Sequence, residues 1–367
     1  MFILVLSGLL YRPKRSGNFQ LPRIKLLLPA YKPDARFSQV LEQLKMVTEG
    51  QSAEVFILFQ YADLKYYELA DELDFEYEIK AFDHLNGNSY QHALRYLAAE
   101  HLPEGSCDYV MILDKDNLMA ADFFQELKKI DLSGFDLVQS VRRPLETAHG
   151  LQVFDALSER LNDLMLRAGK CFWGGPAELS GSAALIKTDI FKDCIKQLDP
   201  KAPGFDKNFM VNLLTSYPSL RTEFSKNLVV YEEKTATVQN YDGQRLRWFG
   251  EQYYNAFYKA GKLLGSVLKG NLKCLDYWVS LARPPRIVLF AMSFLLAAID
   301  LWDSMPGILS IPFVLNYLTF LMVAFPYLDQ IKMLDLIKGG LSVLRSNVYH
   351  SLTSLKSKHL GTFIHTR

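Results

Sequence analysis

The sequence lacks the glycine-rich motifs by which many nucleotide-binding proteins are recognised. Its 367 residues contain neither a G-x-x-x-x-G-K-[ST] P-loop nor a G-x-G-x-x-G fingerprint, so any phosphate group must be bound mainly by side chains and a metal ion. The four cysteines show no C-x-x-C spacing, which argues against a zinc site and a disulfide framework and indicates reduced thiols. The net charge of +1 comes without a basic block interleaved with aromatics, so nucleic acid is not the expected partner.

Charge is also missing from one long part of the chain. The 25 residues Ser304–Leu328 carry none, and as a helix they would exceed the roughly 30 Å of bilayer hydrocarbon. A shorter apolar run over 287–299 precedes them. Together the two runs predict a transmembrane helical hairpin over residues 286–328.

The charges around this hairpin predict its orientation. Its outer turn contains acidic residues but no Lys or Arg, whereas its opposite ends are flanked by Arg283, Arg286, Lys332 and Lys338. Basic residues remain on the cytoplasmic side of a membrane. We therefore expect a membrane protein, of the inner (cytoplasmic) membrane in a bacterium, with its large domain in the cytosol.

Three other segments have apolar or amphipathic patterns. Residues 1–20 begin with ten residues too few to span a bilayer, followed by a basic cluster and no cleavage site, which indicates an interfacial anchor or the tail of a truncated transmembrane helix. Residues 251–285 mix aromatics with lysines and predict amphipathic helices that lie in the lipid headgroup region or dock on the preceding domain. Residues 329–367 predict an amphipathic C-terminal tail.

Between these segments, apolar runs of strand length alternate with helical patterns. This alternation predicts an α/β, Rossmann-like domain with a mainly parallel sheet. Ligands of such sheets bind beyond the carboxyl ends of the strands. The predicted strands are 24–29, 55–59 and 108–113, and the predicted helices are 37–47, 89–100 and 121–130.

Two carboxylates at positions i and i+2 follow one of these strands. The apolar run Val110–Leu113 ends at Asp114-Lys115-Asp116, so both aspartates fall at the carboxyl end of a strand. Such a pair can share one divalent cation, and a hard cation with open coordination positions can hold a diphosphate. The pair indicates a metal-bound nucleotide, although D-x-D triplets also occur in solvated strand-end turns.

Three further features follow in a recognisable order: Asp206, then Gln244-Arg245-Leu246-Arg247-Trp248, then the apolar region. Together with the β/α units and D-x-D, this order resembles the family 2 inverting glycosyltransferases of GT-A fold over roughly residues 22–330. The membrane-integrated members that it resembles are the cellulose, chitin and hyaluronan synthases and the ceramide glucosyltransferases. The resemblance implies a GT-A domain over residues 21–250.

The resemblance assigns a role to each motif. It implies that the D-x-D pair, Asp114 and Asp116, holds Mn²⁺ or Mg²⁺ on the diphosphate of a nucleotide-sugar donor. Asp206 would be the general base that deprotonates the acceptor hydroxyl. The three residues of Q-x-x-R-W would position the donor (Gln244), contact diphosphate oxygens (Arg247) and offer a flat apolar face to the acceptor sugar (Trp248).

These residues also have plain structural interpretations. Asp206 opens an apolar helical pattern, so taken alone it fits a helix N-cap. Arg247 and Trp248 taken alone fit the start of an amphipathic helix whose indole lies in a core. Their joint occurrence in the family order favours the enzyme.

Two loops match the family more weakly. The loop His84-Leu85-Asn86-Gly87-Asn88 resembles the one near the donor, with Asn88 as the candidate ligand, but Asn-Gly is equally a plain turn. The segment Ser180-Gly181-Ser182 resembles the loop near the acceptor and sugar. A tight turn entering a strand at Ala183–Ile186 explains this segment equally well.

The sequence departs from the family pattern at two positions. The turn after the second strand retains only Asp63 as a candidate contact to the nucleotide base. The acidic residue expected directly before the general base is replaced by Phe205. The membrane region is also short, which fits transfer of one sugar better than polymer secretion.

The sequence therefore predicts a membrane-bound, metal-assisted glycosyltransferase that moves a sugar from a nucleotide-diphosphate sugar to a lipid-linked or polysaccharide acceptor. Membrane lipid and other membrane or export subunits are the further partners expected. The alternative is a catalytically silent GT-A scaffold in a polysaccharide assembly or export complex, favoured by the altered positions Asp63 and Phe205. A nucleotidyltransferase shares the metal and donor but has no use for Q-x-x-R-W beside a membrane.

Overall fold

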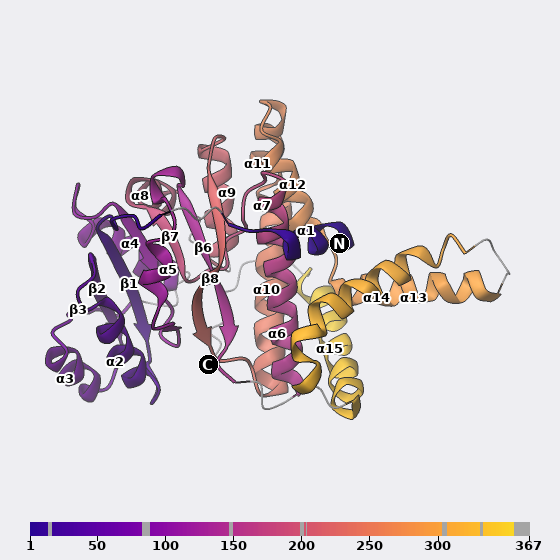
Figure 1. Ribbon diagram of the computed structural model, residues 1–367, viewed down its shortest axis with the longest axis horizontal. Helices are drawn as coiled ribbons and strands as arrows, with labels where there is room; N and C mark the ends of the chain where they lie inside the picture. Colours follow the sequence, from indigo (N-terminus) through magenta and orange to yellow (C-terminus); the bar gives the residue numbers. More distant parts are fainter. Residues whose placement is uncertain are drawn as a thin grey trace.

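Eight strands in the described part of the chain form one sheet, in the order β3-β2-β1-β4-β7-β6-β8-β5 (Figure 1). The computed structural model describes residues 1–13, 17–82, 89–146, 150–198, 202, 204–302, 307–330 and 333–355. The strands are β1 (Ile24–Tyr31), β2 (Ala53–Gln60), β3 (Glu76–Ile79), β4 (Tyr109–Ile112), β5 (Leu118–Met119), β6 (Leu137–Pro144), β7 (Ala184–Lys187) and β8 (Thr222–Glu232).

Most strands of this sheet run in the same direction. β3, β2, β1 and β4 are parallel, and β6 and β8, which are parallel to each other, run in the same direction as these four. β7 is antiparallel to both β4 and β6, and β5 is antiparallel to β8. The prediction of an α/β domain with a mainly parallel sheet is confirmed, and among the described strands β7 and β5 are the two that run in the opposite direction. The chain enters β7 beside the carboxyl end of β4, where the Ala183 N–H donates to the Ile112 carbonyl at 2.8 Å, so β7 runs back along β4.

Helices cover both faces of the sheet because the strands are apolar on both sides. Leu26 and Leu28 of β1 pack with α2 and α5, whereas Leu27 points to the opposite face, with α4, α8 and α9, as the two-residue period of a strand requires. The predicted helices are all present, although the third is shorter than expected. The helices are α2 (Phe37–Thr48), α3 (Leu64–Glu72), α4 (Ser89–Glu100), α5 (Phe123–Leu127), α8 (Thr188–Lys196) and α9 (Asp206–Ser216).

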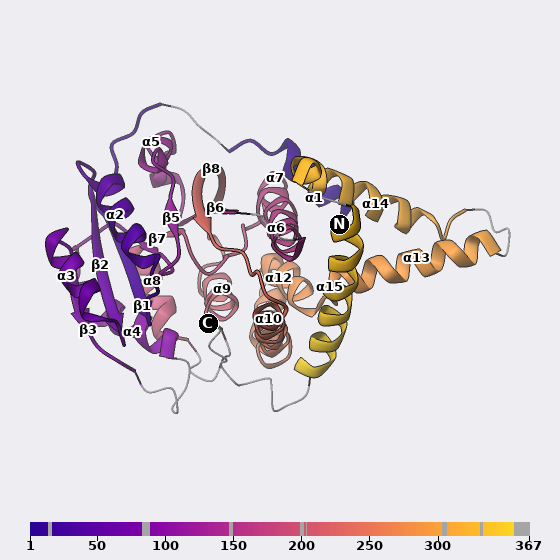
Figure 2. The same ribbon diagram turned by 90° about the horizontal axis from the view of Figure 1, so that it is seen from below.

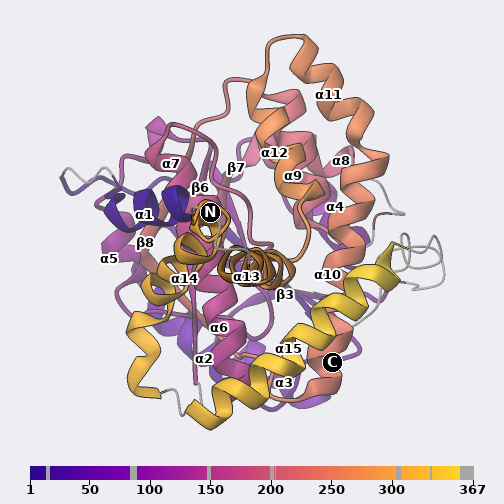
Figure 3. The ribbon, with the colours of Figure 1, turned by 90° about the vertical axis from the view of Figure 1, so that its right-hand side faces the viewer.

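A second group of helices lies beside the sheet (Figures 1 and 2). One helix of this group, α10, begins where the Thr237 hydroxyl accepts a hydrogen bond from the Asn240 N–H at 3.3 Å, a typical N-cap. The boundary predicted between residues 250 and 251 therefore falls inside α10. α15 crosses α10 and α6 (Figure 3). The group comprises α1 (Phe2–Leu10), α6 (Gly150–Asn162), a π-helical turn (Asp163–Ala168), α7 (Gly169–Phe172), α10 (Val238–Tyr258), α11 (Ala260–Leu268), α12 (Leu272–Ala282) and α15 (Met333–Ser354).

The first apolar helix, α1, lies against the π-helical turn. A Cβ added to Gly8 would come within 2.0 Å of the Leu164 carbonyl oxygen, and one added to Gly169 would come within 2.3 Å of the Leu4 carbonyl oxygen. Glycine at both positions lets the two backbones touch. One side of α1 thus packs against the rest of the protein, while Ile3 and Leu10 on the other side are exposed.

The segment expected to hold amphipathic helices docks on the sheet domain with one face. Cys274, Tyr277 and Leu281 of α12, together with Leu263 of α11, belong to the core that also contains α9. The opposite face exposes apolar side chains, including Leu268. One face of these helices is therefore buried by docking on the domain, and the other face remains exposed.

Helices α13 (Arg286–Trp302) and α14 (Ile311–Ala324) form a hairpin that projects from the rest of the molecule (Figures 1 and 2). Near its tip the Asp300 carboxylate accepts hydrogen bonds from the Ser310 N–H at 2.8 Å and from its hydroxyl at 2.7 Å. Further along, the Asn316 side-chain amide donates to the Ser293 hydroxyl at 3.1 Å. These polar contacts join two helices whose outer surfaces are apolar.

The predicted hairpin is present, but its second helix is shorter than the uncharged run from which it was predicted. Its 14 residues extend about 21 Å, because a turn containing Gly307 at φ 78° precedes it. In the described part of the chain no single helix combines the length and apolarity needed to cross a membrane. α12 and α13 meet these requirements only together, across a 75° bend.

Candidate active site

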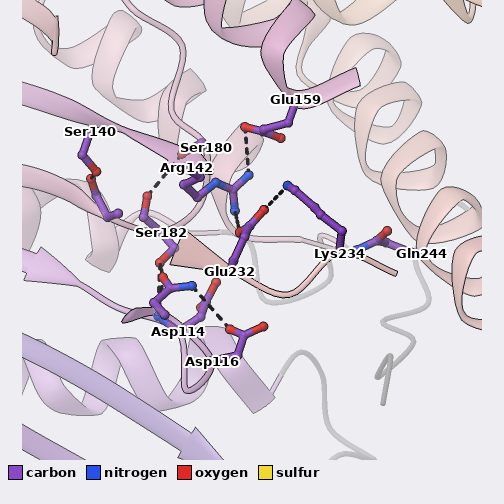
Figure 4. Close-up of polar contacts among 12 residues, drawn as sticks. Asp114, Asp116, Ser140, Arg142, Glu159, Ser180, Ser182, Glu232, Lys234 and Gln244 are labelled. Atoms are coloured by element: carbon purple, nitrogen blue, oxygen red, sulfur yellow. Dashed lines mark hydrogen bonds and ion pairs between the residues drawn. The ribbon is translucent and has the colours of Figure 1, made fainter. Parts of the chain in front are cut away.

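The D-x-D pair lies in a tight turn at the carboxyl end of β4. The Asp114 N–H faces the Asn117 side-chain oxygen at 3.2 Å and the Ser182 hydroxyl at 3.1 Å, and the Asn117 N–H donates to the Asp114 carbonyl at 3.0 Å. The Tyr90 hydroxyl donates to the Asp114 carboxylate at 3.0 Å. The D-x-D segment is therefore both a strand-end turn and a pair of carboxylates, and the turn holds both aspartates in place (Figure 4).

The surroundings of the two carboxylates disfavour two negative charges. Burial raises the pKa of Asp114. It raises the pKa of Asp116 to about 7, with further increases from the charges of Asp114 and Glu232. The positive charges of Arg142 and Arg247 oppose the shift at Asp114. A divalent cation would relieve this repulsion.

Arg142 of β6 is the centre of a chain of ion pairs behind the D-x-D turn (Figure 4). Its guanidinium lies 3.2 Å from the Glu159 carboxylate and 3.1 Å from that of Glu232. Glu232 also pairs with Lys234, and Glu159 pairs with Arg167 at 2.8 Å. Each charge has an opposite neighbour, so the chain can remain ionised beneath the cavity.

Asp206 forms a second carboxylate pair with Glu251, which comes from α10. The Lys207 ammonium lies 3.5 Å from Asp206 and 3.2 Å from Glu251. A Cβ added to Gly204 would meet the Glu251 carboxylate at 2.0 Å. The loop before α9 therefore needs glycine there for the Glu251 side chain to reach Lys207.

One proton is shared unequally across this pair. Burial acts to raise the pKa of Asp206, but the Lys207 ammonium and hydrogen bonds with Glu251 and the Lys207 N–H outweigh it and lower the pKa to about 2. Burial and the Asp206 charge raise the pKa of Glu251 to about 8. At neutral pH Asp206 is charged and Glu251 is protonated.

Most of the predicted site residues line one cavity of about 1110 Å³. They come from the β4 turn, the loop before β7, the start of α9 and the first half of α10, which are far apart in the sequence. The predicted residues that line the cavity are Asp114, Asp116, Ser180, Gly181, Asp206, Gln244, Arg247 and Trp248.

Two predicted residues lie elsewhere, and a third is outside the described residues. Asp63 is exposed before α3 and does not line the cavity, because the turn after β2 directs it outward while Gln60 faces inward. Ser182 is buried and hydrogen-bonded to Asn117, so its contact with the Asp114 N–H positions the D-x-D turn. Asn88 belongs to the undescribed segment.

The Q-x-x-R-W residues lie on α10 and differ in their contacts. Gln244 accepts a hydrogen bond from the Thr235 hydroxyl at 3.1 Å. The Arg245 guanidinium pairs with Asp155 at 2.6 Å and covers one face of the Trp248 ring at 4.5 Å from its centroid. The indole therefore offers an acceptor only its other face or its edge, a restriction on the flat platform expected from the sequence.

Sequence reasoning missed Arg142, Glu159, Glu232 and Glu251. The first three come together only through the pairing of β6 with β8 and the packing of α6 on β6, and no local motif marks them. Glu251 could have been predicted, since it follows Arg247 by four residues and so lies on the same face of a helix.

The sequence around these residues identifies the family. Residues 109–302, just over half of the chain, match the model of Glycosyl transferase family group 2. The chain belongs to this family. It is therefore a glycosyltransferase, and the matched range contains the D-x-D turn, Asp206 and the Q-x-x-R-W residues of α10. No curated protein matches the sequence.

A solved structure supports the same architecture. The mannosyltransferase PcManGT from Pyrobaculum calidifontis, solved in complex with GDP-Man and Mn²⁺, is 14% identical, with a TM-score of 0.57 over 96% of this chain and 93% of that one. A glucosyl-3-phosphoglycerate synthase from Mycobacterium tuberculosis, solved with Mn²⁺, UDP and phosphoglyceric acid, is 16% identical, with a TM-score of 0.38 over 64% of this chain and 74% of that one. The glycosyltransferase has a mixed α/β, GT-A-like fold.

Proposed function

We propose that this glycosyltransferase moves a sugar from a nucleotide-diphosphate sugar to an acceptor hydroxyl with inversion at the anomeric carbon. The observation that carries the proposal is the convergence of Asp114, Asp116, Asp206 and Arg247 on one cavity from separate elements. They supply the acidic, basic and cationic groups that an inverting transfer requires.

The D-x-D turn fits a divalent cation. No group of three or more His, Cys, Asp or Glu side chains among the described residues is arranged to hold a metal by itself, whereas Mg²⁺ commonly uses one or two carboxylates together with substrate phosphates. Asp114 and Asp116 would hold Mn²⁺ or Mg²⁺, as the complexes of the neighbouring enzymes with Mn²⁺ suggest. The bound cation would supply Lewis-acid stabilisation of the leaving diphosphate.

The other donor contacts come from α10, and the loop before β7 contributes to the acceptor side. Arg247 presents a permanently charged fork toward the diphosphate, and its charge already acts on Asp114. Gln244 would position the donor. Ser180 and Gly181 line the same cavity and would contact the acceptor and sugar, and a Cβ at Gly181 would lie 3.8 Å from the Asp206 carboxylate carbon. The φ of Gly181 is +86°, so a side chain at this position would strain the backbone.

Asp206 is the general base in this proposal. Its low pKa keeps it ionised, so it can accept the proton of the acceptor hydroxyl as the bond to the anomeric carbon forms. Trp248 lines the same cavity and would contact the acceptor with its uncovered side. Lys207 and the protonated Glu251 keep the Asp206 carboxylate in place.

The projecting hairpin supports a membrane location for this chemistry. Leu295 is 61% exposed and Leu301 is 82% exposed, and such a contiguous apolar surface marks a membrane or protein interaction site. We assign the catalytic domain to the cytosol and the hairpin to a membrane, in a bacterium the inner one. A lipid-linked or glycan acceptor and other membrane or export subunits are the corresponding partners.

A donor screen on the full chain in detergent tests this function. With Mn²⁺ present, one of the UDP- or GDP-sugars should be hydrolysed or transferred, and both Asp206→Asn and Asp116→Asn should lose this activity while their thermal unfolding stays cooperative. Full activity in both variants would reject the proposal. A silent scaffold would show no binding of any nucleotide with Mn²⁺ by calorimetry.

A further inference from the structure

The cavity extends beyond the residues assigned so far to the base of the projecting hairpin. There it is lined by apolar side chains of both hairpin helices, together with Arg283 and Arg286, which flank Pro284-Pro285 between α12 and α13. The apolar residues are Ile287, Phe290, Tyr317, Phe320 and Val323. Two cations therefore face the cavity where its wall changes from polar to apolar.

The segment that carries these arginines is hydrogen-bonded to α10 and α6. The side-chain amide of Gln252, which follows Glu251 on α10, donates to the Leu281 carbonyl at 2.9 Å and to the Arg283 carbonyl at 2.8 Å. Arg286 donates to the Asn162 side-chain oxygen at the end of α6. The two prolines between the arginines restrict the backbone further.

The carboxylates whose charges act on these arginines are paired with other cations. Glu178 lies 2.8 Å from the Lys170 ammonium, which also pairs with Asp276. Glu159 is shared by Arg142 and Arg167. In the described part of the chain, the carboxylates act on Arg283 and Arg286 only through their charge, without a hydrogen bond.

Two neighbouring guanidinium groups with no carboxylate of their own repel each other in a partly dry cavity. An anion between them would remove this repulsion. Arginine binds phosphate oxygens through a planar fork of donors, and the adjoining apolar wall suits a hydrocarbon chain. The arrangement matches a molecule that carries a phosphate at one end and an apolar tail at the other.

We propose that Arg283 and Arg286 form an anion subsite for the phosphate of an amphiphilic acceptor, whose tail lies along the apolar base of α13 and α14. This subsite rests on the proposed function for its role in transfer, since it places the acceptor between the hairpin and Asp206. The donor diphosphate is assigned to the opposite end, where Arg142 and Arg247 influence Asp114.

Equilibrium binding of dodecyl phosphate below its micelle concentration tests the subsite without any catalysis. The wild-type full chain should bind dodecyl phosphate at least about tenfold more tightly than dodecanol or inorganic phosphate. The double variant Arg283→Gln/Arg286→Gln should lose at least about tenfold in affinity for dodecyl phosphate and leave that for dodecanol unchanged. Arg283→Lys/Arg286→Lys, which keeps both charges, should fall between the two.

The matched control is Arg23→Gln/Arg221→Gln, which removes two charges at the opposite end of the sheet, where both side chains are 57% exposed. It should bind dodecyl phosphate like the wild type. Three results would overturn the subsite: equal affinity in Arg283→Gln/Arg286→Gln, equal affinity for inorganic phosphate and dodecyl phosphate, or a matching loss of nucleotide affinity in the double variant. Absence of donor binding in the wild type would instead contradict the proposed function and leave the subsite standing.

Discussion

The cavity has an acidic end at the sheet and a basic, apolar end at the hairpin. Asp114, Asp116 and Asp206 converge on the first, where their pKa values are set by burial and by neighbouring charges. Arg283 and Arg286 face the second, beside the exposed apolar helices. The difference teaches that one end is built to take up a cation and its nucleotide, while the other is built to take up an anion with an apolar tail.

The largest effect is expected at the acidic end, from Asp206→Asn. Loss of the general base should lower kcat by about 10²–10⁴-fold, while the affinity for nucleotide with Mn²⁺ stays unchanged. Steady-state donor turnover and calorimetry measure the two quantities. Asp189→Asn is the matched control, because Asp189 also lies in the first turn of a helix but is exposed outside the cavity. A wild-type kcat in Asp206→Asn would remove Asp206 from catalysis.

Asp116→Asn should act on binding instead. One carboxylate fewer weakens the hold on the cation, so the affinity for nucleotide with Mn²⁺ should fall by about 10–100-fold. The matched control is Asp63→Asn, which should bind like the wild type because Asp63 lies outside the cavity. If Asp63→Asn weakens nucleotide binding and Asp116→Asn does not, the acidic end has been assigned to the wrong carboxylates.

The Asp206 and Glu251 pair predicts a pH-dependent stability. The pKa of Glu251 is raised to about 8 in the folded protein, so the folded state holds a proton that the unfolded state releases above about pH 4.5. Stability from this group is therefore lost as pH rises, by about 1.4 kcal/mol per unit per proton. Glu251→Gln imitates the protonated form, so its melting temperature relative to the wild type should be higher at pH 9 than at pH 5. A difference that does not change with pH would contradict this protonation.

Gly204→Ala gives the smallest effect and tests the packing behind Asp206. The added Cβ would overlap the Glu251 carboxylate, and overpacking of this kind costs about 1–3 kcal/mol of unfolding free energy. In the background Glu251→Ala the overlap is absent, so the cost of Gly204→Ala should shrink. Equal costs in both backgrounds, measured by thermal unfolding, would show that the two residues do not touch.

The sequence predicted the parts of this molecule that local patterns encode. β1, β2, β4, α2 and α4 follow from apolar periodicity, and the D-x-D turn follows from the abrupt end of an apolar run. The direction of β7 and the ion pairs of Arg142 could not be predicted, because they depend on which distant strands become neighbours. The length of α14 was overestimated since one turn at Gly307 divides an uncharged run.

The site residues divide in the same way. Asp206, Arg247 and Trp248 were predicted because their order along the chain is that of the family, and the structure brings them to one cavity. Helix packing determines that Arg245 lies over the Trp248 ring, and turn geometry determines that Asp63 points outward. Neither is visible in a motif.

Crystals of the full chain grown with Mn²⁺ and the nucleoside diphosphate of the active donor would test the central assignment most directly. The account predicts an anomalous Mn²⁺ peak bound to the Asp116 carboxylate, with the diphosphate between the metal and Arg247. A metal bound away from the D-x-D turn, or a diphosphate held by Arg283 and Arg286, would contradict the division of the cavity into a donor end and an acceptor end.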